Sequence, residues 1–349
     1  MKIGLPIWND GVPPASPRAD GKSLVDSYGR VIRDLRVSLT DRCNYRCVYC
    51  MDPDVRFMRK VDLMTDTEIV RLVRVCAGLG VKRIRLTGGE PSLHPTLTEL
   101  IADLSSIGLD DIAMTTNGSR STRTDLERWR DAGLDRITVS LDSLDTDRFR
   151  AMTRSDDTPE IVLETARLAR EVGLGPIKIN VVIIRGYNDG EIADFAQLAR
   201  ETGFDVRLIE FMPLDSGRRW TMEHVVPGDE MIEKIEERFE LVREGRERKE
   251  SPASAYTFAD GAPGKIGVIA SVTRPFCGAC SRLRVTADGK VMPCLFSTEE
   301  WDLRGLLRGG SDDDIARFLA DATWAKQAGH RIRHPDYVQP DRPMSAIGG

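Results

Sequence analysis

"LRVSLTDRCNYRCVYC", residues 35–50, joins a short β-type run to three closely spaced cysteines, Cys43, Cys47 and Cys50. The run at 35–40 is typical of a strand, and the cysteines follow it directly. In parallel α/β folds, functional residues gather on the loops that follow the carboxyl ends of strands. This stretch therefore predicts a first strand whose following loop carries a reactive centre.

Five further segments repeat one design. Each has an amphipathic helical stretch, a glycine followed by an apolar residue, and a β-rich run. A glycine at that point suits the left-handed residue that ends a helix. The predicted later strands are 82–87, 111–116, 136–142, 177–184 and 206–212. Six strand–helix units predict an α/β fold with a parallel sheet, which we expect to be a partial, open (β/α)6 TIM-like barrel. A flat doubly wound sheet is the alternative that the pattern leaves open.

The pattern changes near residue 215, which predicts three parts. We expect a flexible lead-in at 1–29, the barrel at 30–214, and a smaller C-terminal α+β cap domain at 215–349 that carries a second iron–sulfur site. Within the cap we expect a charged helix at 229–249, a Gly/Pro/Ser loop at 251–265, a cysteine-bearing hairpin and an acidic helical segment.

Composition limits the class of protein. The chain has 349 residues, of which 41% are hydrophobic and 30% charged, as in ordinary globular proteins. A net charge of −5 argues against a general binder of nucleic acid. No apolar run reaches the roughly 18 residues of a membrane span, and the first residues lack the apolar stretch of a signal peptide. We therefore expect a cytoplasmic protein that binds neither nucleic acid nor a membrane.

In a reducing compartment, clustered cysteines bind metal or act in catalysis more often than they form disulfides. A structural zinc site normally has four ligands, and no histidine lies near the first triplet in the sequence. A [4Fe–4S] cluster held by three cysteines, with one iron left open, fits better, although zinc stays an alternative. Cys76, on the apolar face of the predicted 65–79 helix, is expected to belong to the core.

"RPFCGACSRLRVTADGKVMPCLF", residues 274–296, holds a second triplet, Cys277, Cys280 and Cys294. A hairpin with "ADG" as its turn would bring Cys294 back beside the first two cysteines. Three thiolates without a fourth ligand predict a second [4Fe–4S] cluster with an open iron, whereas a zinc ribbon needs a second pair. Arg282 and Arg284 lie two positions apart on the predicted strand, so both point to one face. Two interpretations stay open: a clamp for phosphate and an ordinary solvated face.

The Cys-x3-Cys-x2-Cys triplet, with an aromatic residue before its last cysteine, resembles the radical S-adenosylmethionine (SAM) enzymes. The segments "LTGGEP" (86–91), "TTNG" (115–118) and "VSLD" (139–142), each at a predicted strand end, support the resemblance. A branch of that superfamily that acts on GTP in molybdenum cofactor biosynthesis also has a second triplet. The likeness to that branch runs from about residue 26 to the C-terminus.

The resemblance implies two [4Fe–4S] clusters, the first binding SAM through its open iron and the second binding the guanine of GTP. The implied SAM contacts are Tyr49, Gly89, Ser140 and Met212. The implied GTP contacts are Arg36, Arg85, Thr116 (or its neighbour Thr115), Lys178, Arg282 and Arg284. The implied catalytic residues are Arg282, Arg284, Gly348 and Gly349, with the two glycines reaching into the site from the C-terminus.

The implied reaction is a lyase-type cyclisation. Reductive cleavage of SAM gives a 5′-deoxyadenosyl radical, which takes the 3′ hydrogen of the GTP ribose, and the carbon radical then attacks C8 of guanine. The product, (8S)-3′,8-cyclo-7,8-dihydroguanosine 5′-triphosphate, is the first intermediate of molybdenum cofactor (molybdopterin) biosynthesis.

The resemblance also implies partners. An electron donor such as flavodoxin or ferredoxin would supply electrons, and the product would pass to cyclic pyranopterin monophosphate synthase. A homodimer is compatible with the resemblance. Two alternatives stay open: another radical SAM enzyme with an auxiliary cluster, such as a peptide-maturing one, and a non-catalytic iron–sulfur or zinc protein.

Overall fold

The computed structural model describes residues 23–348, so most of the predicted lead-in and Gly349 lie outside the described residues. Twelve strands form a single sheet. They are β1 (Asp34–Ser38), β2 (Arg83–Thr87), β3 (Asp111–Thr116), β4 (Arg136–Ser140), β5 (Lys178–Ile183), β6 (Asp205–Glu210), β7 (Leu241–Gly245), β8 (Ser254–Phe258), β9 (Lys265–Ile269), β10 (Arg282–Val285), β11 (Lys290–Met292) and β12 (Trp301–Asp302).

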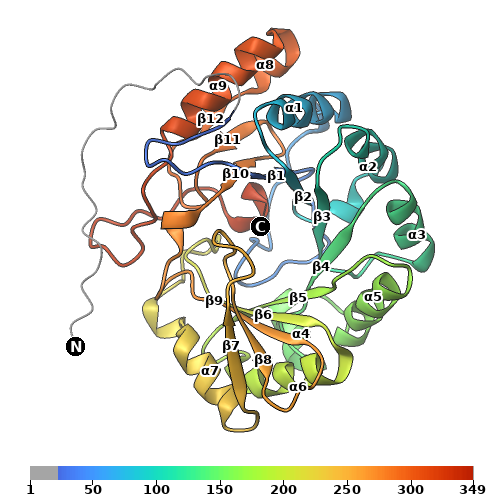
Figure 1. Ribbon diagram of the computed structural model, residues 1–349, viewed down its shortest axis with the longest axis vertical. Helices are drawn as coiled ribbons and strands as arrows, with labels where there is room; N and C mark the ends of the chain where they lie inside the picture. The colour runs from blue at the N-terminus through green and yellow to red at the C-terminus, as the bar shows by residue number, and fades with distance from the viewer. Residues whose placement is uncertain (1–22, 349) are drawn as a thin grey trace.

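The sheet is an open barrel with β1 to β6 side by side and parallel. The predicted open barrel of six units is therefore confirmed. The C-terminal part of the chain extends the same sheet, because β10 pairs with β1 and β9 pairs with β6, both in parallel. The outer strands β11, β12, β8 and β7 are antiparallel to their neighbours. Figure 1 shows the strands as an arc that curves around an interior.

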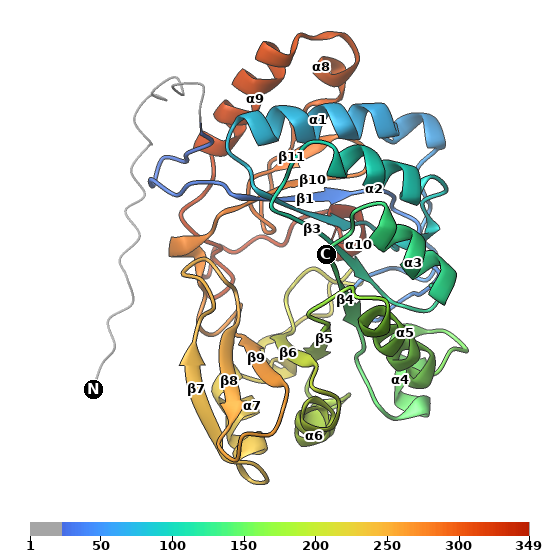
Figure 2. The same cartoon turned by 45° about the vertical axis from the view of Figure 1, so that its right-hand side comes forward.

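Ten α-helices are described within residues 23–348. They are α1 (Asp66–Gly78), α2 (Leu97–Ser105), α3 (Arg123–Asp131), α4 (Thr146–Thr153), α5 (Pro159–Glu171), α6 (Ile192–Thr202), α7 (Gly228–Glu236), α8 (Arg304–Gly309), α9 (Asp312–Trp324) and α10 (Met344–Ile347). The crossover helices lie outside the arc of strands, whereas α10 lies inside it (Figures 1 and 2). A capping box formed by Thr65 and Glu68 begins α1.

The two faces of the barrel strands differ because side chains alternate along a strand. On β1, Leu35 and Val37 are fully buried among the apolar side chains of the surrounding helices. Arg36, between them, faces the interior instead. Cys76 is fully buried in the apolar core, as predicted. Apolar packing thus lies outside the barrel wall, and the inner side carries charged and polar groups together with apolar side chains such as Val182 and Ile209.

Two predictions for the C-terminal part are wrong. The charged helix expected at 229–249 ends at Glu236, and 241–245 forms β7. The loop expected at 251–265 contains β8. Both segments gain regular hydrogen bonds from each other, because β7 and β8 pair as an antiparallel ribbon, and such long-range pairing overrides a local helix pattern. The predicted cysteine-bearing hairpin is confirmed as β10 and β11.

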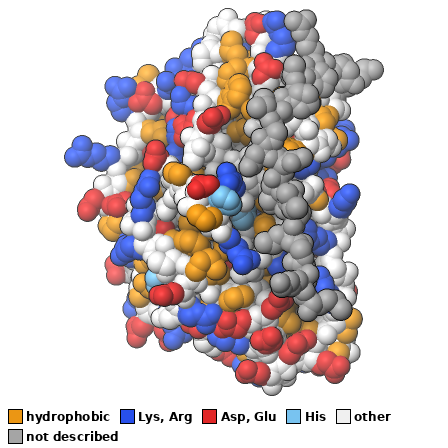
Figure 3. All heavy atoms as spheres, turned by 90° about the vertical axis from the view of Figure 1, so that its left-hand side faces the viewer, with side chains coloured by type: hydrophobic (Ala, Val, Ile, Leu, Met, Phe, Trp, Pro, Cys, Tyr) orange, Lys and Arg blue, Asp and Glu red, His pale blue; other side chains and the backbone are white. Residues whose placement is uncertain are grey.

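The C-terminal helices pack beside the first one: the Arg71 side chain on α1 donates to Asp312 on α9 at 2.7 Å. The predicted domain boundary at 214/215 stays a prediction, and the sheet runs continuously across it. No helix within residues 23–348 is long and apolar enough to cross a membrane. On the face seen in Figure 3, basic and acidic side chains are mixed.

Candidate active site

One cavity of about 280 Å³ lies inside the barrel. All six cysteines of the two triplets line it, although they come from opposite ends of the chain: Cys43, Cys47, Cys50, Cys277, Cys280 and Cys294. The thiols are free and partly buried. The fold therefore brings the two triplets to one space.

The first triplet lies on the loop after β1. A tight turn joins Cys47 to Cys50, whose amide donates to the Cys47 carbonyl at 3.0 Å. The amides of Arg46 and Val48 donate to carbonyls at the end of α4, each at 2.9 Å. These backbone contacts fix the loop while its thiols stay free to bind a ligand.

Both glycines of "LTGGEP" are required because a side chain at either position would collide with the backbone of the cysteine loop. A Cβ on Gly89 would overlap the Arg42 carbonyl, and one on Gly88 would lie 2.6 Å from the Thr40 carbonyl. The Gly89 amide donates to Thr40 at 2.7 Å, and the Glu90 amide donates to Arg42 at the same distance. Both glycines also line the cavity. Their lack of side chains lets this loop dock against the cysteine loop.

Glu90 is the central residue of that docking, and it is buried. Its carboxylate accepts hydrogen bonds from the Thr116 hydroxyl and the Asn117 amide, both at 2.7 Å, and from the Ser92 amide at 2.9 Å. Burial raises the pKa of Glu90, against the lowering effect of these donors. Glu90 thus ties the loops after β2 and β3 together.

The predicted SAM contacts Tyr49, Gly89, Ser140 and Met212 all line the cavity. The Tyr49 hydroxyl donates to Asp142 at 2.7 Å, and the other oxygen of Asp142 accepts from the Val182 amide at 2.9 Å. These bonds fix the Tyr49 ring beside Cys50. The assignment of the four residues to SAM stays a prediction.

The second triplet is held by a short turn and by the barrel strand β10. The Cys280 amide donates to Cys277 at 3.1 Å, and the Arg30 guanidinium donates to the Cys277 carbonyl at 2.8 Å. Lys326 is buried and donates to the carbonyls of Arg282 and Pro293, on either side of the hairpin that returns Cys294. The hairpin therefore closes around the three thiols.

The donor sets fit iron–sulfur clusters. Each triplet offers three free thiols, which is the donor set of a [4Fe–4S] cluster that keeps one iron open. Burial raises the pKa of Cys43 to about 11 and that of Cys50 to about 12. Thiolates there need a bound positive group, which iron supplies.

At the second triplet the chain supplies positive charge itself. Burial would raise the pKa of Cys280, but Arg282 and Lys326 lower it to about 6. A thiolate is therefore favoured at Cys280 even before iron binds.

A group of cations lines the cavity beside the triplets: Arg36, Arg85, Arg207, Arg282, Arg284 and Lys326. Burial, together with Arg284 and Arg85, holds the pKa of Arg36 well below its ordinary value. Burial, with Arg136 and Arg207, lowers the pKa of Arg85 to about 9. Neither Arg36 nor Arg207 makes a side-chain hydrogen bond or ion pair within residues 23–348. Buried guanidinium groups without a hydrogen-bond partner favour an anionic ligand.

Two predicted GTP contacts lie differently from the others. Lys178 is outside the cavity lining, and its ammonium lies 3.7 Å from the Glu247 carboxylate. Thr116 lines the cavity, but its hydroxyl donates to Glu90. Thr115 accepts a hydrogen bond from Arg85 at 3.1 Å. Thr115 is therefore the threonine that faces the cations, and the choice between the two stays a prediction.

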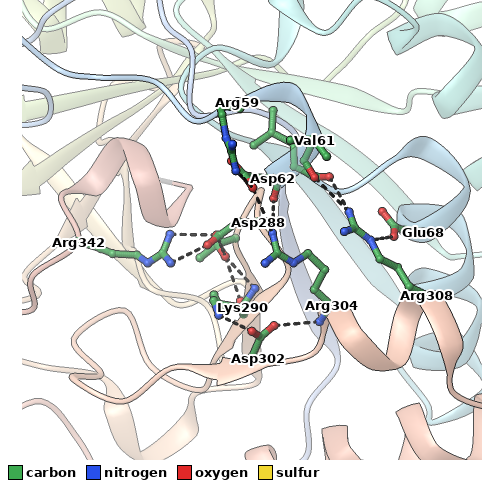
Figure 4. A network of polar contacts seen from close by, with 12 residues as sticks. Arg59, Val61, Asp62, Glu68, Asp288, Lys290, Asp302, Arg304, Arg308 and Arg342 are labelled. Carbon is green, nitrogen blue, oxygen red and sulfur yellow. Dashed lines mark hydrogen bonds and ion pairs between the residues drawn. The ribbon is translucent and has the colours of Figure 1, made fainter.

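The C-terminal tail returns to the barrel interior. Arg342 is mostly buried. Its guanidinium donates to Asp288 at 2.8 and 3.0 Å (Figure 4) and to Glu300 at 2.9 Å. The Arg284 guanidinium then donates to the Gly348 carbonyl at 3.3 Å. The predicted catalytic glycine Gly348 thus meets a predicted catalytic arginine, whereas Gly349 lies outside the described residues.

Sequence reasoning missed four residues of the site: Glu90, Asp142, Arg207 and Lys326. Arg207 could have been found, because it lies two positions before Ile209 on a predicted strand. The two side chains therefore share a face, as do those of Arg282 and Arg284. Glu90 is part of the quoted "LTGGEP", but its bonding depends on the fold. Lys326 carries no local signal.

Comparisons with known proteins agree with this geometry. Residues 37–199 match the model of the radical SAM superfamily, and residues 204–332 match the family described as Molybdenum Cofactor Synthesis C. The chain is 47% identical over 339 residues to a GTP 3′,8-cyclase of Streptomyces coelicolor, covering 96% of this chain and 99% of that protein. It is 43% identical over 360 residues to a GTP 3′,8-cyclase of Mycolicibacterium smegmatis, covering 99% of each chain.

The fold is similar to that of a solved structure. Streptococcus suis SuiB, crystallised with S-adenosylmethionine, superposes with a TM-score of 0.59 at 12% identity, covering 82% of this chain and 66% of SuiB. At that identity the likeness concerns the fold alone.

Proposed function

The chain belongs to the GTP 3′,8-cyclase family of the radical SAM superfamily, and from this premise we propose that it converts GTP to (8S)-3′,8-cyclo-7,8-dihydroguanosine 5′-triphosphate. This reaction is the first step of molybdenum cofactor biosynthesis. As a radical SAM enzyme the chain uses SAM and an iron–sulfur cluster. The observation that carries the proposal is that one cavity brings both cysteine triplets together with a group of arginines.

We assign one [4Fe–4S] cluster to each triplet, the first for SAM and the second for the guanine of GTP. Bound at the first triplet, the cluster and SAM supply a 5′-deoxyadenosyl radical. The chain's own residues hold the substrates. Tyr49, fixed by Asp142, lines the SAM side, and Arg36, Arg85 and Arg207 leave three guanidinium groups for the triphosphate.

The residues also limit side reactions. Removal of the 3′ hydrogen leaves a carbon radical on GTP, which must meet C8 before it meets solvent. The cavity is bounded by the barrel wall and, at Met344 and Ser345, by the tail helix α10. The product is an isomer of GTP, so one electron and one proton must reach the nucleotide after the new bond forms. We propose flavodoxin or ferredoxin as donor, cyclic pyranopterin monophosphate synthase as the next enzyme, and a homodimer as the assembly.

Metal analysis and an anaerobic assay test the proposal. After reconstitution we expect about eight iron and eight sulfide per chain. With SAM, dithionite and GTP, we expect 5′-deoxyadenosine and a cyclised nucleotide, and neither should form with the Cys47→Ser variant. One or two zinc ions per chain in place of iron, or iron-loaded protein that gives neither product, would overturn the proposal.

A further inference from the structure

The loop between β7 and β8, residues 246–253, brings two carboxylates to the amino-terminal end of the barrel. Glu247 lies 3.7 Å from Lys178, the first residue of β5. Glu250 lies 3.3 Å from Arg83, the first residue of β2. The first cysteine loop lies at the opposite, carboxyl end of the strands, whereas Cys277 and Cys280 directly precede β10, which is parallel to β1, and so lie at the amino end. The 246–253 loop therefore lies at the same end of the barrel as the second triplet, and its Arg246 lies 5.6 Å from the centre of the Phe276 ring beside Cys277.

Glu247 is the shared counter-ion of several cations. Burial would raise the pKa of Glu247, but Lys178, Arg207, Lys265 and Arg248 together lower it. Its side chain is 47% exposed, whereas that of Lys178 is 8% exposed. At 3.7 Å the pair is an ion pair without a hydrogen bond, which makes it a weak contact that an anion of higher charge can replace.

The loop also separates two spaces. A small second cavity of about 20 Å³ is lined by Arg207, Glu247 and Ser251, among others. Arg207 lines the main cavity too, as does Pro252 from the same loop. Lys178 is outside the main lining, with Glu247 paired to it. A phosphate chain that extends past Arg207 toward Lys178 therefore meets the Glu247 carboxylate first.

We infer that Glu247 is a substrate-displaced counter-ion. In the free protein its carboxylate neutralises Lys178 and its neighbours, and the terminal phosphates of GTP take its place, moving the 246–253 loop outward. Glu247 thereby sets how strongly the site distinguishes nucleotides by their number of phosphates. This inference rests on the proposed function, because it requires GTP as the ligand.

The test is binding of GTP and guanosine to the reconstituted full-length protein at pH 7, measured by anaerobic calorimetry. In Glu247→Gln we expect GTP to bind about fivefold more tightly, because a competing carboxylate is removed, and guanosine to bind unchanged. The control is Glu244→Gln, which removes the same charge three residues away, from a pair with the exposed Lys265. We expect no more than about a twofold change there.

Hydrogen exchange of the wild-type loop gives a second measurement that needs no variant. We expect peptides covering 246–253 to exchange faster when GTP is bound. Unchanged or weaker GTP binding by Glu247→Gln, an equal gain for guanosine, or slower exchange of the loop would overturn the inference. If the wild-type protein binds GTP while these results appear, only the inference fails; if it binds no GTP, the proposed function fails as well.

Discussion

Replacing Arg342 by Met should release the C-terminal tail from the barrel. The Arg342 guanidinium is the clasp of the tail: it is bonded to Asp288 and Glu300, and the three side chains are 17%, 12% and 30% exposed. Methionine keeps the length of the side chain but removes the guanidinium from both carboxylates, while Asp288 keeps the hydrogen bond from the Thr286 hydroxyl at 2.6 Å. The docked tail then depends on backbone contacts such as the Met344 amide on Leu214, at 3.1 Å.

The magnitude follows from these contacts. A hydrogen bond between charged groups contributes about 1.5–3 kcal/mol, and breaking a buried ion pair costs about 3–5 kcal/mol. Because Glu300 is partly exposed, solvent screens its share. We therefore expect the clasp to stabilise the docked tail by about 3 kcal/mol, which corresponds to a factor of about 150 in the docking equilibrium.

Hydrogen exchange followed by mass spectrometry measures this equilibrium directly. In Arg342→Met we expect the amides of Met344 and Gly348 to exchange about 100-fold faster. Turnover to the cyclised nucleotide should fall at least about tenfold, because the Gly348 contact with Arg284 is lost while the cysteine loops stay intact. Iron content should not change.

Arg317→Met is the matched control. Arg317 lies on α9 and pairs with Asp314 on its own helix, where it is 76% exposed. It should leave exchange and turnover unchanged. Wild-type turnover or wild-type exchange of the tail in Arg342→Met would refute the role of the clasp.

Three further predictions concern the loops and the cations. Gly89→Ala places a Cβ against the Arg42 carbonyl, so we expect iron to fall from about eight to about four per chain by loss of the first cluster; full iron content would contradict this. Cys294→Ser should also halve the iron but leave SAM binding unchanged in a calorimetric titration, and loss of SAM binding would count against separate sites. Burial and Arg207 lower the pKa of Lys178 to about 8. A bound triphosphate must raise this pKa, because it stabilises the ammonium form. GTP affinity should therefore be highest below pH 8 and about tenfold weaker at pH 9. Lys178→Gln should lose this pH dependence, and an unchanged profile in that variant would exclude Lys178 as its source.

The local sequence pattern was sufficient to predict the barrel and the two cysteine triplets. Segments such as 35–40 and 111–116 are short β-rich runs, and the glycines that end the preceding helices mark the units. The cysteine spacing needs no fold to be recognised. For the same reason the hairpin that carries Cys294 was predicted correctly.

The segment that was predicted wrongly and the site residues that were not predicted depend on contacts between distant parts of the chain. The 241–245 segment looks helical by its charges, and only its pairing with β8 makes it a strand. Glu90 acts through residues on a different loop. Lys326 reaches the second triplet from a helix end that has no pattern of its own. These positions follow from the folded geometry, which a short window of sequence does not contain.

The most direct test of the account follows one hydrogen. GTP carrying deuterium at the ribose 3′ position is incubated anaerobically with the reconstituted protein, SAM and dithionite, and the 5′-deoxyadenosine is analysed by mass spectrometry. Abstraction of the 3′ hydrogen predicts one deuterium in 5′-deoxyadenosine, with formation of the cyclised nucleotide. Unlabelled 5′-deoxyadenosine produced alongside that nucleotide, or no dependence of its formation on GTP, would contradict the account.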